Sequence, residues 1–338
     1  MSSLDAALLN DYQRDFPLVS EPFAQIARAH DMDTKSVLKA LKSLKVAGKI
    51  SRIGPVFRPN TIGVSTLAAM KIPANQLEQV AGLVNRYAQV NHNYEREHAY
   101  NLWFVVTAPD QQHLENTLGQ IEKESGIEVM RLPLLKEFHI DLGFNLAKGP
   151  HKHATQQPVK NKTKGTQPDD RIQQKLIAEI QSGLPLLERP YQAIANRLGV
   201  AEQTVIQRLQ WMLDNGTIRR MGVVVRHREL GYRANAMLVW DFDDGQVDAM
   251  GKRLSAIDCV TLCYQRPRHL PDWPYNLFTM IHGKDKASVE KRIQQIIEAF
   301  ALADIPKATL FSKRRFKQCG ACYRYSQPET HYQSASNG

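Results

Sequence analysis

Two short segments concentrate residue types that can bind carboxylates and transfer protons. Residues 93–104 read NYEREHAYNLWF, and residues 263–278 read CYQRPRHLPDWPYNLF. Arginine is suited to bidentate binding of a carboxylate, and histidine exchanges a proton near neutral pH. Aromatic rings can supply apolar walls beside these polar groups. The two segments therefore hold the residue types that could bind an anionic ligand and exchange a proton with it.

Three histidines are the candidate proton donors. His98 is the first candidate, because Arg96 precedes it by two residues and tyrosines flank the pair. His269 lies in the second segment, and His139 lies near the end of a predicted strand. A positioned histidine is the usual general acid near neutral pH. The alternative for each is a solvent-exposed or structural histidine.

A second set of residues is predicted to bind the ligand through cations and aromatic rings. In the first segment Tyr94, Arg96, His98 and Tyr100 have the same strand parity if the turn is tight, so they would project toward one face. Residues 312–317, SKRRFK, add a basic cluster on a later strand. The alternative is a solvated sheet face. The predicted ligand-binding residues are Tyr94, Arg96, Tyr100, Trp103, Tyr264, Arg266, Tyr275, Arg314, Arg315 and Lys317.

An internal repeat organises the elements that position these residues. Shifting the sequence by 168 positions places Leu8–Gly63 on Leu176–Gly231 without a gap, with sixteen identities. The motif Tyr-Asn-Leu at 100–102 returns at 275–277, where the offset has grown to 175. The matches fall on apolar and turn positions, so the chain contains two copies of one structural unit.

Each copy is predicted to hold two domains. The first domain is predicted to be a winged helix-turn-helix, with helices at 5–12, 22–30 and 33–47. Gly48 closes the third helix, and a two-stranded wing follows from 50–57. The second domain is predicted to be a ferredoxin-like sandwich with the order βαββαβ. Its strands are expected at 65–72, 90–96, 100–107 and 128–140, and its helices at 74–88 and 110–125. The predicted fold class is α+β. The predicted domains are 1–63, 64–146, 171–231 and 232–325, with a flexible basic linker at 147–170 and a disordered tail at 326–338.

Composition restricts the class of protein. The formal net charge of +10 favours an anionic partner, either nucleic acid or a small molecule with several carboxylates or phosphates. The linker supplies part of that charge. No apolar run approaches the length of a membrane helix, and the N-terminus lacks the layout of a signal peptide, so we expect a cytoplasmic protein. No phosphate loop, dinucleotide fingerprint or serine-type triad is present.

Four cysteines in a chain of 338 residues do not form a disulfide framework. Cys319 and Cys322 have the spacing of a metal or redox pair, and Cys259 and Cys263 lie on a nearby predicted strand. The first copy has no cysteine at the equivalent positions. We therefore predict no metal site and leave the role of Cys319 and Cys322 open.

The pairing of a winged helix with a βαββαβ domain resembles the Lrp/AsnC family of bacterial regulators. The two segments at 93–104 and 263–278 resemble the hairpins of siroheme decarboxylases, which are built from two Lrp-like subunits. In some organisms these subunits are fused, and this chain is similar to such a fusion of the NirD and NirL types. The resemblance covers both halves, nearly all of the chain outside the linker.

The resemblance implies a carboxy-lyase that converts siroheme to 12,18-didecarboxysiroheme by removing two acetate carboxylates. The product would feed the d1-type haem of nitrite reductase in denitrification, or haem itself by an alternative route. It implies no cofactor beyond the iron of the substrate, and an internal pseudo-dimer of the two halves. A histidine would then either donate the proton or ligate the iron. The order of the two steps and any further association of chains stay open.

The main alternative is a DNA-binding regulator, and a third hypothesis is a tetrapyrrole sensor without catalysis. A recognition helix should offer donors to bases and phosphates. The first copy offers Lys35, Lys39 and Lys42, whereas the second offers mainly glutamines with Trp211. Two diverged recognition helices suit a palindromic site poorly, so we expect at most weak, sequence-independent DNA binding.

Overall fold

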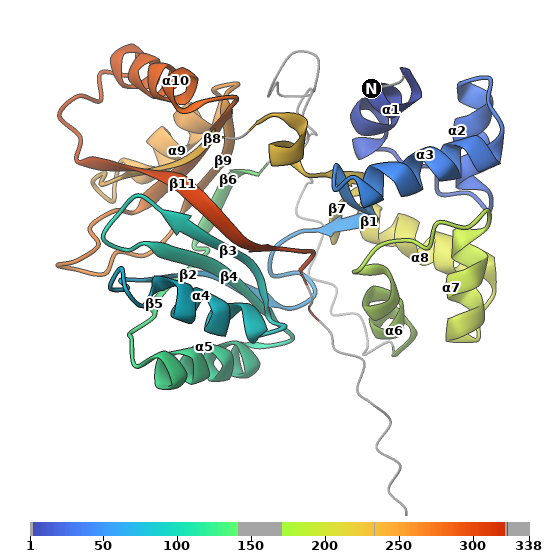
Figure 1. The fold of residues 1–338 in the computed structure, drawn as a ribbon, viewed down its shortest axis with the longest axis horizontal. Helices are drawn as coiled ribbons and strands as arrows, with labels where there is room; N and C mark the ends of the chain where they lie inside the picture. Colours follow the sequence, from blue (N-terminus) through green and yellow to red (C-terminus); the bar gives the residue numbers. More distant parts are fainter. Residues whose placement is uncertain (1–2, 141–170, 233, 322, 324–338) are drawn as a thin grey trace, which may run out of the picture.

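The computed structural model describes residues 3–140, 171–232, 234–321 and 323, arranged in two lobes (Figure 1). One lobe holds the helical domains of both copies, and the other holds both sheets with their covering helices. The predicted linker at 147–170 and the predicted tail at 326–338 lie outside the described residues, as does Cys322. The domain boundaries stay predictions.

The helical lobe contains three helices from each copy, close to the predicted positions. In α2 a proline occupies the first turn, which suits its missing N–H. In α3 the Asp33 carboxylate accepts the backbone N–H of Ser36, and Gly48 follows the helix with a φ of +72°. The bounds are α1 Ser3–Asn10, a 3₁₀ turn η1 Asp11–Gln13, α2 Pro22–Ala29, α3 Thr34–Val46, α6 Arg171–Ile180, α7 Pro190–Leu198 and α8 Glu202–Asp214.

The prediction of a two-stranded wing within each copy is wrong. The single strand β1 (Ile50–Phe57) pairs antiparallel with β7 (Ile218–Val225) of the other copy, with Gly54 opposite Gly222. Apolar residues of both strands, such as Ile53 and Val223, lie in one core that all six helices share. Pairing between copies closes that common core, which two separate hairpins would leave divided.

The other lobe contains two sheets of the predicted ferredoxin-like order. The strands run β5-β2-β4-β3 in the first copy and β11-β8-β10-β9 in the second, all antiparallel. The bounds in the first copy are β2 Val64–Met70, α4 Leu77–Arg86, β3 Val90–Arg96, β4 Leu102–Ala108, α5 Gln111–Ser125 and β5 Met130–Pro133. In the second copy they are η2 His227–Leu230, β8 Ala234–Trp240, α9 Val247–Ser255, β9 Val260–Gln265, β10 Leu277–Gly283, α10 Lys286–Ala299 and β11 Lys307–Gln318.

The last strand of each copy reaches into the sheet of the other copy. β11 pairs with β8 through residues 307–311 and then with β3 of the first copy through residues 312–318. The predicted single strand at 128–140 is wrong, because the chain bends after Pro133 into a separate strand β6 (Lys136–Ile140). β6 pairs with β9 of the second copy. These exchanges join the two sheets into one nine-stranded system.

Three apolar clusters hold this lobe together. One cluster lies between the first sheet and helices α4 and α5, and a second between the other sheet and α9 and α10. The third includes Trp103, Trp273, Phe278 and Leu310, which come from both copies. Because strands alternate their faces, each sheet has an outer face under its helices and an inner face that meets the other sheet. Candidate site residues such as Trp103, Tyr264 and Tyr275 belong to or pack against the cluster between these inner faces.

Candidate functional site

Side chains on strand β3 alternate between two faces of the sheet, so structural residues lie on one face and candidate functional residues on the other. Asn93 and Glu95 are buried toward α4 and β11: the Asn93 side chain donates to the Ala81 carbonyl at 3.2 Å. His92, Tyr94 and Arg96 occupy the opposite, inner face. Four residues of strand span about 13 Å, so these three side chains form a row of that length.

Arg96 and Arg266 hold equivalent positions in the two copies. Arg96 Nη1 donates to the Leu310 carbonyl of β11 at 2.9 Å, and Arg266 Nη1 donates to the Leu132 carbonyl of β5, so each contacts a strand of the other copy. Each guanidinium also lies over the tyrosine two residues before it, at 6.0 Å from the Tyr94 ring and 4.6 Å from the Tyr264 ring. Burial lowers the pKa of Arg96 to about 10 and also lowers that of Arg266.

One buried arginine and two half-buried arginines have no carboxylate partner among the residues that the structure describes. They are Arg52, Arg96 and Arg266, and burial lowers the pKa of each. Nε of Arg52 and Nε of Arg266 are buried without a hydrogen bond in the described chain. A buried cation without a counter-ion is costly, so these groups favour an anionic ligand. Arginines that do pair with Asp or Glu are Arg86, Arg131, Arg189, Arg197, Arg219, Arg268, Arg314 and Arg315.

Arg96 meets polar residues of the second copy that sequence reasoning missed. Its Nη1 donates to Asn235 Oδ1 at 3.2 Å, and Asn235 lies opposite His282 in the register of β8 and β10. Nδ1 of His282 lies 2.9 Å from the Thr261 hydroxyl, which donates to the Met280 carbonyl at 3.1 Å. The hydroxyl oxygen therefore accepts from Nδ1–H of His282. Burial, and then the charge of Arg96, lower the pKa of His282 to about 4.

The hairpin after β3 ends in an aromatic cluster. The Arg96 N–H donates to the Asn101 carbonyl, so His98 and Tyr100 lie in a loop outside the strand, and their predicted strand parity does not hold. The His98 ring stacks on Tyr100 at 6.3 Å and meets the edge of Trp273 at 5.4 Å. Trp273 is fully buried and also contacts Trp103 at 5.2 Å and Tyr275 at 4.9 Å.

The geometry fixes the neutral tautomer of His98. Its Nδ1 accepts the backbone N–H of Tyr100 at 3.0 Å, so in the neutral ring the proton lies on Nε2. Burial lowers the pKa of His98 below its usual value. Nε2 is therefore the ring nitrogen of His98 that is left to face a ligand, and donation of a proton from it requires the imidazolium form, which the lowered pKa disfavours near neutral pH.

The other two candidate histidines are placed differently. His269 Nε2 lies 2.7 Å from the Arg131 carbonyl and anchors the second hairpin to the first copy. Backbone hydrogen bonds between His269 and Trp273 close that hairpin and direct the Trp273 ring into the core. His139 lies on β6 in register with Cys263. The three histidines thus lie on different elements with different neighbours, and a catalytic role for His139 or His269 stays a prediction.

The basic cluster on β11 divides between the two faces of the sheet. Arg314 is neutralised by Glu95 and Glu78, and Lys317 Nζ donates at 2.8 Å to the carbonyls of Asn85 and Tyr87 at the end of α4. These contacts give Arg314 and Lys317 structural roles, and ligand binding by them stays a prediction. Arg315 lies opposite Tyr94 in the register and pairs with Glu229 at 2.9 Å.

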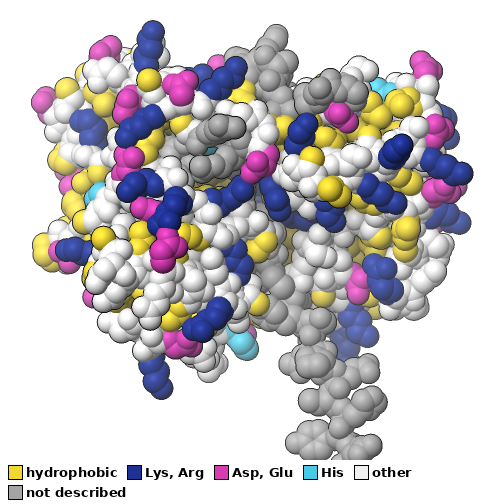
Figure 2. Space-filling model, in the orientation of Figure 1, with side chains coloured by type: hydrophobic (Ala, Val, Ile, Leu, Met, Phe, Trp, Pro, Cys, Tyr) yellow, Lys and Arg dark blue, Asp and Glu magenta, His cyan; other side chains and the backbone are white. Residues whose placement is uncertain are grey.

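A second polar group lies where the lobes meet, and the sequence did not single it out. Arg52 of β1 is close enough to His92 that its charge, after burial, lowers the His92 pKa to about 4. His92 stacks on Tyr94 at 6.2 Å, and its Nδ1 lies 2.7 Å from Asn91 Oδ1. Lys and Arg side chains gather in this region (Figure 2). His92, Tyr94 and Arg96 occupy alternate positions in the sequence, and this spacing was the signal from which His92 could have been predicted as a site residue.

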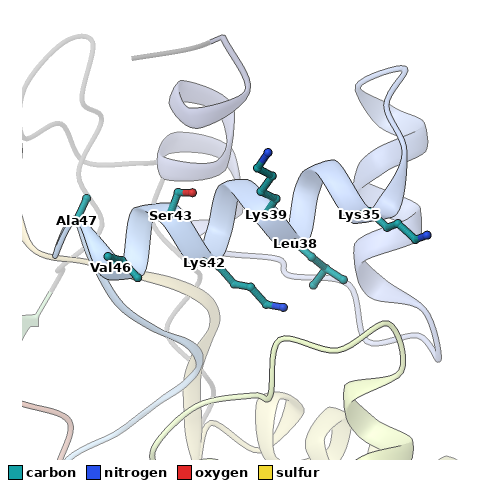
Figure 3. Close-up of a pocket in the computed structure, with 7 residues that line it drawn as sticks. All are labelled: Lys35, Leu38, Lys39, Lys42, Ser43, Val46 and Ala47. Carbon is teal, nitrogen blue, oxygen red and sulfur yellow. The ribbon is translucent and has the colours of Figure 1, made fainter.

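A hollow of about 610 Å³ lies against the recognition helix of the first copy, away from these residues (Figure 3). Its lining is Lys35, Leu38, Lys39, Lys42, Ser43, Val46 and Ala47, all on α3 or directly after it. In the described chain, no three His, Cys, Asp or Glu side chains are grouped as a metal site requires. Among the same residues, no helix has the length and apolarity to span a membrane.

Comparison with known proteins agrees with this architecture. Residues 61–139 and 229–317 match the AsnC-like ligand binding domain, and residues 5–50 and 173–219 match the siroheme decarboxylase NirDL-like HTH domain. The chain is therefore a tandem pair of helix-turn-helix and AsnC-like ligand-binding domains. It is 41% identical to a siroheme decarboxylase NirDL subunit of Paracoccus pantotrophus, over 95% of this chain and 97% of that protein.

A second relative, a siroheme decarboxylase of Hydrogenobacter thermophilus, is 32% identical over 92% of both chains. The crystal structure of the siroheme decarboxylase NirDL covers 95% of this chain and 94% of its own, with 28% identity and a TM-score of 0.69. A co-complex of that protein with an iron-uroporphyrin III analogue gives a TM-score of 0.67. This chain belongs to the siroheme decarboxylase family, a family of carboxy-lyases, in its fused two-half form.

Proposed function

We propose that this chain removes the acetate carboxylates at ring positions 12 and 18 of siroheme and releases 12,18-didecarboxysiroheme. In each step the bond between the acetate methylene and its carboxylate breaks, and carbon dioxide leaves. The electron pair stays on the methylene carbon, where the ring can delocalise it, and a proton converts that carbon to a methyl group. The step is redox-neutral, so no cofactor is proposed beyond the iron of the substrate.

One observation carries this proposal: buried Arg96 and half-buried Arg52 and Arg266 have no carboxylate partner in the described chain. Siroheme carries eight carboxylates on an extended ring. Its carboxylates would supply the missing counter-charges through charge-assisted hydrogen bonds. Tyr94, Tyr100, Trp103, Tyr264 and Tyr275 would provide aromatic contacts beside them.

The roles proposed for the side chains follow from their placement. Arg96 and Arg315, at the β3–β11 boundary, would bind and orient carboxylates. His98 would donate the proton from Nε2 of its imidazolium form and become the neutral ring, whose Nδ1 accepts the Tyr100 N–H. His139 and His269 remain candidates for the second acetate, and ligation of the iron is the alternative role for any of these histidines.

The test is anaerobic incubation of the pure, folded protein with siroheme, followed by mass analysis of the tetrapyrrole. The expected result is a mass lower by two carbon dioxide units, without an added organic cofactor. Unchanged mass with bound tetrapyrrole would reject the enzyme and leave a sensor. A second experiment supplies the product to extracts that lack either the d1-type haem pathway or haem formation. Conversion of the product in one extract and not in the other shows which pathway uses it.

A further inference from the structure

Arg96 belongs to the first half of the chain but is held by the second half. Its Nη1 donates to two acceptors there, the Leu310 carbonyl at 2.9 Å and Asn235 Oδ1 at 3.2 Å. Leu310 lies on β11 and Asn235 on β8. Because the Arg96 residue is only 7% exposed, these two contacts determine where its guanidinium lies.

A second neutral side chain lies beside Asn235. His282 is opposite Asn235 in the register of β8 and β10, and its Nδ1 donates to the Thr261 hydroxyl at 2.9 Å. Burial, and then the charge of Arg96, lower the pKa of His282 to about 4. Near neutral pH the His282 ring is therefore uncharged and adds no second cation beside Arg96.

The acceptors that hold Arg96 are dipoles without a net charge. A carbonyl and an amide oxygen reduce the cost of burying a guanidinium, but they do not cancel its charge. Arg314 on β11 is the contrast, because Glu95 and Glu78 neutralise it. Within the described part of the chain, Nε and Nη2 of Arg96 donate no hydrogen bond. Arg96 therefore keeps its charge and these donors for an external anion.

The fold itself does not require an asparagine and a histidine at these two positions. In the first half the equivalent pair is Ser65 opposite Thr107, at the same register positions of β2 and β4. Arg266, the equivalent of Arg96, has the same kind of backbone contact, to the Leu132 carbonyl. Both arginines thus have a backbone acceptor in the other half, whereas the amide and the imidazole are features of the half that holds Arg96.

We propose that Asn235, with His282 beside it, is a positioning residue that holds Arg96 in place for a carboxylate of the ligand and leaves its charge unneutralised. This inference rests on the proposed function, in which Arg96 binds a carboxylate, and adds how the second half prepares that arginine. A negatively charged side chain at position 235 would pair with Arg96 instead. The ligand would then have to displace an internal ion pair, so its binding would be weaker.

The first test changes the charge at position 235 without changing its shape. Asn235→Asp should weaken binding of iron uroporphyrin III, followed by absorbance, by at least roughly tenfold, because the new carboxylate competes for Arg96. Its urea midpoint should not fall, because the variant gives a buried cation a partner. Gln112→Glu adds the same charge at the exposed start of α5 and should alter neither quantity. Unchanged affinity in Asn235→Asp, or weaker binding together with a lower midpoint, would overturn the inference.

The second test separates positioning from chemistry with siroheme. Asn235→Asp should raise KM more than it lowers the single-turnover rate at saturation, because His98 is unaltered. Asn235→Ser, which copies Ser65 and adds no charge, should weaken binding less than Asn235→Asp does. The opposite order would contradict the inference. Protein that binds iron uroporphyrin III in the expected order but releases no carbon dioxide from siroheme would reject the proposed function alone. Conversion of siroheme with the same KM in all three forms would reject the inference alone.

Discussion

At the scale of single residues, function in this chain depends on where proton-bearing groups are fixed. His98 keeps its proton on Nε2 because Nδ1 accepts a backbone N–H, whereas His269 uses Nε2 to hold a loop. The two residues look alike in the sequence, since each follows an arginine within a short hairpin. Their hydrogen-bond partners, and not their neighbours in sequence, separate the proposed proton donor from a residue that anchors a loop.

The first prediction concerns His98. His98→Ala and His98→Gln should lower turnover by roughly 10²–10⁴-fold, because neither side chain supplies the proton. Tetrapyrrole affinity should remain largely intact, since the arginines are unchanged. Steady-state and single-turnover assays with siroheme measure both. His113→Gln is the control, because His113 is exposed at the start of α5, beside Asp110. Unaltered turnover in His98→Ala would place the acid elsewhere.

The second prediction concerns the stability of the protein in acid. The pKa values of His92 and His282 are about 4 in the folded protein, below the usual 6.5. Between these values the unfolded chain binds more protons than the folded one, so stability should fall as the pH falls from about 6.5 to about 4. Urea unfolding at several pH values measures this slope. The double variant His92→Gln, His282→Gln should flatten it; an equally steep slope would contradict the assignment.

At the scale of elements, the exchanged strands determine how the halves fit. β6 leaves the first half and lies on the second, where the Phe138 ring sits directly against Gly251 of α9. A methyl group at position 251 would overlap that ring. The glycine therefore lets the crossing strand approach the helix. The same strand carries His139, so the position of the strand on the second half also determines where this candidate residue lies.

The third prediction tests this seating. Gly251→Ala should lower the free energy of unfolding by about 1–3 kcal/mol through overpacking. Gly82→Ala is the matched control on α4, where no atom lies within 4 Å of an added methyl, and should raise stability by up to about 1 kcal/mol. Chemical denaturation measures each change. Combining Gly251→Ala with Phe138→Leu should recover part of the loss; a simple addition of two losses would contradict the contact.

At the scale of the whole molecule, the two halves form one folded unit. The pairs β1–β7, β3–β11 and β6–β9 all join one half to the other. The helical lobe has a single core drawn from both halves, from Leu8 and Phe23 to Leu176 and Tyr191. Neither half can bury its apolar residues alone, so the halves should fold together even when they are separate chains.

The fourth prediction follows from these pairings. Residues 1–146 and 171–338, co-expressed as two chains, should purify as a 1:1 complex with siroheme turnover near that of the intact protein. The complex should persist in about 1 M salt, because backbone pairing and apolar contacts are little affected by screening. Each piece expressed alone is the control and should aggregate or remain unfolded. Separate, independently folded halves would contradict the shared core.

The fifth prediction concerns DNA. The α3 surface exposes lysines around the hollow in Figure 3, whereas α8 buries Glu202 and exposes Trp211. Two such unlike helices cannot read matching half-sites. We expect weak binding that is equal for promoter and scrambled duplexes and fades by about 200 mM salt, measured by fluorescence anisotropy. Lys39→Gln with Lys42→Gln should weaken it for both duplexes alike. A sequence-specific footprint on DNA that persists at this salt concentration would favour the alternative hypothesis of a DNA-binding regulator.

Local sequence patterns determined the elements and their repetition. The repeat at an offset of 168 residues predicted two copies of one unit. Asp33 and Gly48 indicated the two ends of α3, and β3 was predicted at its observed bounds of Val90–Arg96. The hairpin segments pointed to the family to which the chain belongs. Caps, turns and alternation act over a few residues, so the sequence states them directly.

Tertiary structure alone decided which strands pair and which polar groups meet. Nothing in residues 50–57 indicates that their partner lies about 170 residues away, because antiparallel pairing leaves no local signature of its partner. The same is true of Arg96 beside Asn235 and His282, and of Arg315 opposite Tyr94. These groups come together only when the last strand of each half crosses into the other, since that exchange is what places both copies around one set of side chains.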